Sequence, residues 1–347
     1  MTELRIGFIA LTDAAALIAA AELGFAADEG LRIRLEREAS WATLRDKLAL
    51  GFVDAAHMLA PLAIATSLGL APRGAPLTLV APLALNLNGN AFTVSLPLWG
   101  EMTDAGPTAT YPERRAALAA AIRGRGAAGR PPLTLATVHP FSTHTYQLRR
   151  LLGPEVAETD VRITVVPPAH MVEALRMESV DGFCVGSPWN SVAVESGFGR
   201  IAALGTEIAP GAPEKVLAWP RGRLDPAIGA AVVRAVQAAG DWCAEPANRG
   251  ELAFLLAKPQ HLDLPAAIIR RTLDGRLIVD PDGSTAIDPD YLTLGGATHR
   301  PAPEQARWIF AEMVAADQVG RGRVEEAAAV YDPAFYEDAL RMVAPAE

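Results

Sequence analysis

The chain has 347 residues, half of them hydrophobic and 20% charged. This length is too great for one small core and fits two domains of ordinary size, and the composition is that of a globular protein rather than a disordered one. The formal net charge is −9, and the basic residues form pairs rather than long runs. An acidic surface of this kind disfavours direct nucleic-acid binding.

The two cysteines, Cys184 and Cys243, show no metal-ligand spacing such as Cys-x-x-Cys. We predict that both are free thiols, with Cys184 a small core residue because it lies in an apolar run. The sequence leads from Met1 almost directly into a predicted strand, and neither a secretory leader nor a membrane-spanning segment is apparent. These features predict a cytoplasmic protein with no cofactor, no metal and no membrane partner.

The beginning of the chain alternates between strands and helices. Residues 4–10 predict a strand, residues 14–23 an alanine-rich helix ending at Gly24, and residues 31–36 a half-exposed strand. This order predicts an α/β fold. The turn at Thr12-Asp13 then falls at the carboxyl end of the first strand, where open α/β sheets bind ligands.

Ser40 is suited to cap the next helix, which places Trp41 in its first turn. A packing role is the more common one for such a tryptophan, and the alternative is a pocket wall or an indole N–H donor. Further on, residues 54–61 predict a short strand ending at a proline, residues 62–68 a helix, and residues 77–85 an apolar strand.

Residues 86–95 interrupt this apolar pattern with three carboxamides and a glycine. Glycine allows close backbone approach, and asparagine side chains can bind a ligand or tie a loop. We predict the first crossing between domains here, with Asn90 as a candidate ligand donor. A hydrogen-bonded hinge is an equally good interpretation.

Residues 133–152 predict a buried strand, a polar turn from His139 to Thr143, and a helix capped by Ser142 or Thr143. Such a junction directs backbone N–H groups and the positive end of the helix dipole to one point, which favours a small anion. Ser142 and His144 are candidate hydrogen-bond donors to it. A simple cap and a satisfied histidine are the alternatives.

The rest of the chain supplies two more candidates. Gly186, at the end of a strand predicted over 180–186, could bring a backbone N–H near a ligand, whereas Lys215 opens a strand that returns to the first domain. Position alone would make Lys215 a solvated side chain. The other predicted elements are a helix at 114–123, a loop at 124–132, a strand at 161–166, a helix at 170–177, a strand at 201–204, and helices at 226–243, 247–257, 265–272 and 303–317.

Together these stretches resemble one family, the nitrate- and bicarbonate-binding solute receptors of ABC transporters and their soluble relatives. The matching segments follow one order from Gly7 to Lys215. They are Gly7–Asp13, Arg37–Trp41 with Arg45–Leu48, Asp54–Pro61, Asn86–Asn90, His139–His144, Asp181–Gly186 with Pro188–Asn190, and Pro213–Lys215.

The resemblance implies a two-lobed periplasmic-binding-protein-like fold of type II, the C-clamp variant, with the ligand cleft between the lobes. Residues 1–92 plus 206–347, including a helical C-terminal part, would form lobe I, and residues 93–205 would form lobe II. The chain departs from the family at Ser187, where the family has an acidic residue before Pro188-Trp189.

The resemblance also implies nitrate or nitrite as the ligand. The positions that surround the anion in the family correspond to Trp41, Asn90, His144 and Lys215, and Ser142 and Gly186 complete the candidate site. Bicarbonate-binding members favour an acidic residue at the lysine position. Lys215 therefore argues for a permanent anion.

Within the family the chain looks like the cytoplasmic nitrate/nitrite sensors of the NasS type. This implies a non-enzymatic sensor that holds an RNA-binding antitermination regulator of the NasT (ANTAR) type and releases it when the anion binds. The alternatives are a solute receptor of a nitrate ABC transporter and an enzyme on the same fold, for which the sequence offers no GxSxG motif.

Two substitutions follow from this assignment. Lys215→Ala is expected to abolish anion binding while leaving the fold intact, because the anion loses its counter-charge. His144→Ala is expected to weaken binding less, because backbone donors at the helix start remain.

Overall fold

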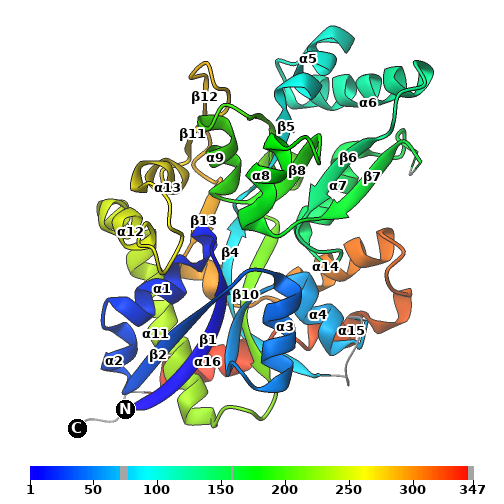
Figure 1. Cartoon of the computed structure of the whole chain (residues 1–347). Coiled ribbons are helices and arrows are strands. Elements are labelled where there is room, and N and C mark those ends of the chain that lie inside the picture. Colours follow the sequence, from blue (N-terminus) through cyan, green and yellow to red (C-terminus); the bar gives the residue numbers. More distant parts are fainter. Residues whose placement is uncertain (71–76, 158, 343–347) are drawn as a thin grey trace.

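Two β-sheets organise the chain into two lobes, as Figure 1 shows for the computed structural model, which describes residues 1–70, 77–157 and 159–342. One sheet has six strands in the order β13-β4-β10-β3-β1-β2, and the other has five strands in the order β7-β6-β8-β5-β9. Helices pack beside both sheets. The predicted two-lobed α/β fold is confirmed.

The six-stranded sheet belongs to lobe I, and its β10 strand is the return strand predicted near Lys215. β10 pairs antiparallel with both β3 and β4, so the middle of the sheet is closed by a segment far away in sequence. The strands are β1 (Thr2–Ile9), β2 (Leu31–Glu38), β3 (Ala55–Leu59), β4 (Leu79–Asn88), β10 (Pro213–Pro220) and β13 (Leu292–Leu294).

Lobe II contains the five-stranded sheet, in which β5 pairs antiparallel with β8 and β9 while β6 runs parallel to β7 and β8. Its strands are β5 (Asn90–Ser95), β6 (Leu133–Thr137), β7 (Val161–Val165), β8 (Gly182–Gly186) and β9 (Gly199–Leu204). Its helices are α5 (Leu96–Ala105), α6 (Tyr111–Ala127), α7 (Thr143–Leu152), α8 (Met171–Arg176), α9 (Trp189–Glu195) and α10 (Gly205–Ile208).

The helices of lobe I come from both ends of the chain, because the C-terminal half returns to it after lobe II. They are α1 (Ala15–Glu22), α2 (Phe25–Asp28), α3 (Trp41–Leu50), α4 (Ala60–Ser67), α11 (Pro226–Ala244), α12 (Arg249–Leu256), α13 (Ala266–Leu273), α14 (Pro303–Ala315), α15 (Val324–Ala328) and α16 (Pro333–Arg341). Short 3-10 turns are η1 (Thr12–Ala14), η2 (Pro168–His170), η3 (Pro246–Asn248), η4 (Gly296–His299) and η5 (Arg321–Arg323).

The first crossing between the sheets takes one residue, Gly89, which separates β4 from β5. Gly89 has a φ of +95°, and a Cβ there would lie 2.9 Å from Leu292. Only glycine meets both conditions without strain. The strands thus divide between the sheets three residues before the predicted boundary at 92/93, which lies inside β5.

A β-hairpin from the C-terminal half of the chain packs against lobe II. It consists of β11 (Arg276–Ile278) and β12 (Thr285–Ile287), and it follows α13. The Ile201 amide donates a hydrogen bond to the Val279 carbonyl at 2.9 Å, and Leu277 packs in a buried group with Ala91 and Leu204. Residues from within 206–347 therefore contact both lobes.

Two predicted elements need correction in extent. The helix predicted at 114–123 is α6, which begins at Tyr111 and continues to Ala127, into the first part of the stretch predicted as a loop at 124–132. A capping box of Thr110 and Glu113 begins it, and such reciprocal capping stabilises a helix start. The helix α5 and the short strand β13 were not predicted.

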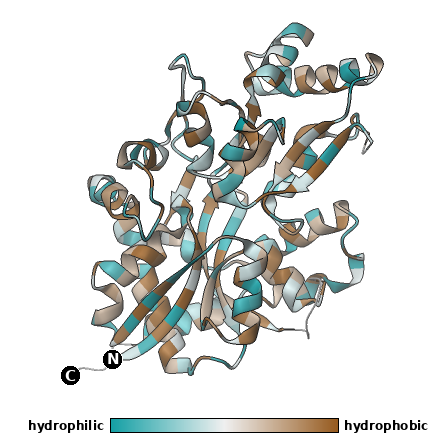
Figure 2. Ribbon diagram, viewed as in Figure 1, coloured by the Kyte–Doolittle hydropathy of each residue, from teal (hydrophilic) through white to brown (hydrophobic). Residues whose placement is uncertain are grey.

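The lobes are packed around apolar side chains, and Figure 2 shows hydrophobic residues along the strands of both sheets. One buried apolar group continues from lobe I into lobe II, since Leu11 and Trp41 share it with Tyr146, Phe183 and Trp189. The interface between lobes is therefore a continuous part of the core. Both cysteines are buried and free, as predicted.

Candidate functional site

A group of buried polar side chains lies where the two lobes meet, and we call it the buried polar cluster. Its members come from η1, α3, β3 and β10 in lobe I, and from β5 and α7 in lobe II. None is more than 3% exposed, although buried charges are rare in proteins. The members are Asp13, Trp41, His57, Asn90, His144, Gln147, Glu214 and Lys215.

Lys215 is the one cation of the buried polar cluster. Its Nζ lies 2.9 Å from Asp13 Oδ2 and 2.6 Å from Glu214 Oε2, and 5.6 Å from the centre of the Trp41 ring. A buried ammonium needs such partners, because an isolated charge is costly away from water. The predicted ligand residue Lys215 is therefore buried in two ion pairs.

An irregularity of β10 explains why both Glu214 and Lys215 face the buried polar cluster. Neighbouring residues of a regular strand point to opposite faces. The pairing of β10 with β4 shifts register between Pro213 and Lys215 and again between Lys215 and Val216. Such bulges redirect a side chain, and they are frequent beside functional sites.

The ion pairs control the charge states of Asp13 and Lys215. Burial by itself would raise the pKa of the Asp13 carboxyl, but Lys215 and His57 hold that pKa well below its usual value. Burial by itself would lower the pKa of Lys215, but Asp13 and Glu214 raise it above its usual value. Both groups are charged at neutral pH.

The two histidines of the buried polar cluster are neutral at pH 7. Burial lowers the pKa of His57 although Asp13 Oδ1 lies 2.9 Å from its Nε2. Burial also lowers the pKa of His144 to about 4, although the Glu214 carboxylate opposes the effect from 3.9 Å. Neither ring nitrogen of His144 has a hydrogen-bond partner within the part of the chain that the structure describes.

Asn90 and Gly186 lie opposite each other in the pairing of β5 with β8. Asn90 Nδ2 donates to Glu214 Oε1 at 2.6 Å and to Gln147 Oε1 at 3.0 Å. A Cβ added to Gly186 would lie 3.5 Å from both Asn90 Oδ1 and Asp13 Oδ2. The backbone of Gly186 therefore lies directly beside the buried polar cluster.

Ser142 is the N-cap of α7, which was one of its two predicted roles. Its Oγ accepts a hydrogen bond from the Thr145 amide at 3.1 Å and donates one to the His139 carbonyl at 2.6 Å. These bonds occupy the hydroxyl proton. The geometry therefore favours the capping role of Ser142 over direct donation to a ligand.

Trp41 has the predicted packing role, and its alternative role as a donor to a ligand stays a prediction. It is 1% exposed and stacks at a tilt against His57, with ring centres 5.5 Å apart. Its indole Nε1 is buried without a hydrogen-bond partner among the described residues. Buried indole N–H groups usually have a partner, so this donor is available to a ligand.

The segment around Ser187 joins the lobes through backbone groups. The Thr12 amide donates to the Ser187 carbonyl at 2.9 Å, and Trp189 Nε1 donates to the Ala10 carbonyl at 3.1 Å. Thr143 Oγ1 adds a third link to the Pro213 carbonyl at 3.0 Å. The contacts that close the lobes here do not need the acidic side chain that the family carries at position 187.

Five of the predicted ligand residues lie at the buried polar cluster: Trp41, Asn90, His144, Gly186 and Lys215. The sixth, Ser142, is the N-cap of α7. The predicted ligand residues did not include His57, Gln147 or Glu214, and Asp13 was predicted only as part of a turn. Charged or polar residues inside apolar strands, as in Ala55–Leu59, were the signal that could have found His57 and Glu214.

The donors of the buried polar cluster are suited to a small planar oxyanion. The Glu214 carboxylate is itself such a group, and it is held by the Lys215 ammonium and the Asn90 amide. Charge-assisted hydrogen bonds of this kind are the strong ones. Trp41 Nε1 and one ring nitrogen of the neutral His144 are further potential donors within the same cluster.

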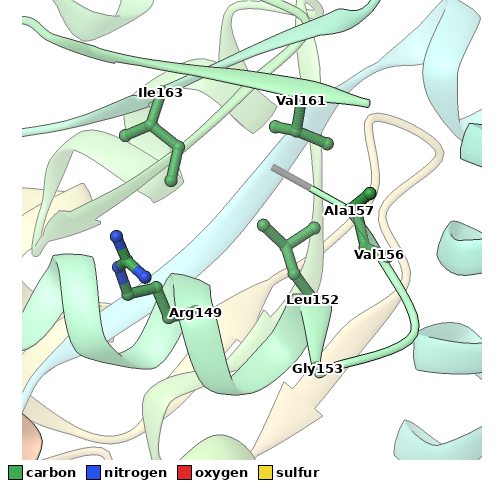
Figure 3. Close-up of a pocket in the computed structure, with 7 residues that line it drawn as sticks. All are labelled: Arg149, Leu152, Gly153, Val156, Ala157, Val161 and Ile163. Atoms are coloured by element: carbon green, nitrogen blue, oxygen red, sulfur yellow. The ribbon is translucent and has the colours of Figure 1, made fainter. Parts of the chain in front are cut away.

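A separate pocket of about 300 Å³ lies on lobe II, between α7 and β7 (Figure 3). Apolar side chains dominate its lining, with Arg149 at one side. The lining residues are Arg149, Leu152, Gly153, Val156, Ala157, Val161 and Ile163. It contains none of the residues of the buried polar cluster.

Two further features of the described residues concern metal binding and membrane insertion. Within residues 1–70, 77–157 and 159–342, no group of three or more His, Cys, Asp or Glu side chains is arranged to hold a metal ion. Among the helices of that same part of the chain, none is both long and apolar enough to cross a bilayer.

The chain is similar in sequence to a bicarbonate transport ATP-binding protein and to a nitrate/nitrite binding protein. The bicarbonate transport ATP-binding protein CmpC of Synechococcus elongatus is 32% identical over 321 residues, which are 90% of this chain and 45% of that protein. The nitrate/nitrite binding protein NrtA of Synechocystis sp. is 31% identical over 274 residues, which are 76% of this chain and 58% of that protein. The chain thus spans about half the length of these relatives.

The fold is also that of solved binding proteins. The crystal structure of the periplasmic nitrate-binding protein NrtA from Synechocystis PCC 6803 matches with a TM-score of 0.88 and 26% identity, covering 98% of this chain and 89% of that one. A sequence model described as the NMT1-like family matches residues 1–257. The chain therefore belongs to the NMT1-like family, with nitrate/nitrite binding proteins among its relatives.

Proposed function

We propose that the chain is a non-enzymatic receptor for nitrate or nitrite and that the anion binds between the lobes at the buried polar cluster. The observation that carries this proposal is Lys215, a fully buried ammonium at the lobe interface in a fold shared with a nitrate-binding protein. A buried cation that is retained at such a cost is typical of a functional site.

Each residue has a distinct part in the proposed site. Lys215 supplies the counter-charge, and Asn90 and Trp41 supply directed N–H donors for the oxygens of the anion. His144 approaches from the start of α7, where the helix dipole also favours an anion. Gly186 leaves room because it has no side chain.

The signalling role belongs to the same proposal. Without the anion, a cytoplasmic sensor would hold an antitermination regulator of the NasT (ANTAR) type, and the anion would release it and so permit expression of nitrate assimilation genes. The anion needs only to bind the partner-free form better than the partner-bound form. A tenfold difference corresponds to about 1.4 kcal/mol, which lies within the usual range of allosteric coupling.

A second candidate is the solute receptor of a nitrate ABC transporter. The similarity to a periplasmic nitrate-binding protein over 98% of the chain favours it. Both candidates use the same anion site, and they differ in cellular compartment and partner. Fractionation of the native organism separates them, because a cytoplasmic location supports the sensor and an exported protein supports the transporter receptor.

Calorimetric titration of the purified chain with nitrate, nitrite and bicarbonate tests the ligand. Binding of nitrate or nitrite in preference to bicarbonate supports the receptor. Absence of heat with all three anions, in protein whose folding is verified by circular dichroism, would rule out the proposed ligand class.

The partner is tested separately with a purified ANTAR-type regulator. Size-exclusion chromatography of the mixture should show a complex without nitrate and its dissociation when nitrate is added. A mixture that runs as separate proteins under both conditions would refute the sensor role and leave the anion site unaffected.

A further inference from the structure

The donors expected to hold an anion are already engaged by an acidic side chain of the same chain. Glu214 accepts from Lys215 Nζ at 2.6 Å and from Asn90 Nδ2 at 2.6 Å. Lys215 is also paired with Asp13, at 2.9 Å. An incoming nitrate would therefore be the third anionic group around one ammonium.

The charge balance of the buried polar cluster makes this unfavourable. Asp13 and Glu214 are both ion-paired with the single ammonium of Lys215, and His57 and His144 are neutral at pH 7. Two carboxylates and one ammonium leave one negative charge. A bound nitrate would add a second. Uncompensated charge buried at the interface is strongly destabilising, whereas one added proton restores the original balance.

We propose that Glu214 is a specificity-determining residue which makes anion binding take up one proton, held by His144 beside the Glu214 carboxylate. This inference rests on the proposed anion site. It adds a selectivity rule, because the site accepts an anion together with a proton and rejects the same anion when no proton is available.

His144 has the geometry for this task. Its Nε2 lies 3.9 Å from Glu214 Oε2, its side chain is fully buried, and neither nitrogen has a partner in the described part of the chain. Both nitrogens are donors once the ring is protonated. One N–H can then serve Glu214, and the other remains for the anion.

The charged groups that face His144 have opposing effects. Glu214 on β10 and Asp13 on η1 favour its protonation, whereas Lys215 on β10 opposes it. His57 on β3 is neutral, and its Nε2 lies 2.9 Å from Asp13 Oδ1. A bound anion adds a further negative charge on the favouring side, so the pKa of His144 rises from about 4 when the anion binds.

The sign of the pH dependence follows from this shift. Between the pKa of His144 in the free protein and its higher pKa in the complex, binding takes up a proton, so affinity falls as pH rises. The decrease approaches tenfold per pH unit where a full proton is taken up. Above the pKa of the complex, only weak binding to the neutral form remains.

The test is calorimetric titration with sodium nitrate and sodium nitrite at pH 6, 7 and 8, in two buffers with different ionisation enthalpies. The buffer dependence of the heat reports the protons taken up per anion. We expect uptake approaching one proton at pH 6 and an affinity at least fivefold lower at pH 8.

Glu214→Gln should change this behaviour in a defined way. The variant removes one negative charge from the buried polar cluster, so the anion should bind with little proton uptake and more tightly than in the unmodified chain at pH 8. Glu251→Gln is the matched control, because Glu251 is exposed on α12. It should keep the uptake and the pH dependence of the original chain.

If Glu214→Gln does not fold, the variant His144→Gln still tests the inference. It should bind the anion weakly and without proton uptake. Nitrate binding by the unmodified chain without proton uptake would overturn the inference and leave the proposed function standing. No binding of either anion from pH 6 to 8 would overturn the proposed function and this inference with it.

Discussion

The two lobes contribute different kinds of group to the buried polar cluster. Lobe I supplies its charged members, Asp13, Glu214 and Lys215, on a single sheet and its adjoining turn. Lobe II supplies Asn90, His144 and Gln147, which are neutral at pH 7, together with the backbone of Gly186. The charges of the site therefore lie within lobe I, and its hydrogen bonding depends on side chains of lobe II.

This division indicates how the site works. Charge interactions within lobe I do not depend on contact between the lobes, whereas the hydrogen bonds from β5 and the approach of α7 require the lobes to meet. At pH 7, substitutions of the charged members in lobe I should therefore change stability and affinity together, and substitutions of the neutral members in lobe II should act mainly on affinity. The following experiments test that difference, from the largest expected effect to the smallest.

Lys215→Ala should abolish anion binding and also lower the free energy of unfolding by about 3–5 kcal/mol, because it leaves the buried Asp13 and Glu214 carboxylates without a cation. The sequence alone predicted that this substitution would leave the fold intact. The ion pairs of Lys215 instead predict a loss of stability. Urea unfolding and nitrate titration measure the two effects. Lys258→Ala, at a half-exposed lysine, is the control. Nitrate affinity equal to that of the original chain would disprove the placement of Lys215.

Lowering the pH should weaken the lobe II side of the interface before it affects Asp13. Burial lowers the pKa values of His139 and His144 to about 4. Their unfolded forms protonate near the usual value of 6.5, so stability is complete above pH 6.5 and is lost as pH falls toward 4. The loss is roughly 1.4 kcal/mol per histidine for each pH unit in this window.

Urea unfolding at pH 7 and pH 5 measures that loss. His139→Gln should reduce the difference between the two pH values, whereas His170→Gln, at an exposed histidine, should leave it unchanged. Asp13 acts at lower pH, because its contribution to stability is complete above the usual carboxyl pKa of about 3.8 and is lost as pH falls below that value. Equal midpoints at pH 7 and 5 would show that the buried histidines are not linked to folding.

His144→Ala should weaken nitrate binding roughly tenfold or somewhat more at pH 6, corresponding to about 1–2 kcal/mol for a lost hydrogen bond. The effect should be smaller than that of Lys215→Ala, since backbone donors at the start of α7 and the Lys215 charge remain. Calorimetry gives both affinities. If His144→Ala proved the more damaging substitution, the division of roles between the lobes would be wrong.

Glu312→Gln should have the smallest effect. Glu312 on α14 accepts from Arg150 Nε on α7 at 3.0 Å, which links the lobes at their rim. The Arg150 side chain is 43% exposed, and pairs of this kind contribute less than about 1 kcal/mol. The nitrate affinity measured by calorimetry should change less than about threefold. A larger loss would show that the rim, rather than the buried polar cluster, controls closure.

Much of the fold could be predicted because its signals are local. Apolar runs and turn residues located β1, β3, β6 and β8, and the capping pattern located the starts of α3 and α7 at Ser40 and Ser142. The end of the helix α6 could not be read in this way. Its glycines resemble a loop in composition, but the helix continues through them to Ala127.

The candidate site was predicted partly from residues and partly from family resemblance. A strand, a polar turn and a helix start directed attention to His144, and the break in apolar pattern directed it to Asn90. Lys215 gave no signal of its own, because a lone lysine at the start of a strand is usually solvated. Its position in the family supplied that assignment, and the structure then gave it Asp13 and Glu214 as partners.

The sequence by itself determined the order of elements, the caps and the acidic, globular character of the chain, because these depend on neighbours within a few residues. Only the tertiary structure decided that β10 lies between β3 and β4, and that its irregular pairing turns both Glu214 and Lys215 toward the same buried cluster. Strand alternation predicts opposite faces for adjacent residues. Pairing between β10 and β4, which are more than a hundred residues apart in sequence, breaks this alternation. Both side chains therefore enter the buried polar cluster and determine its charge.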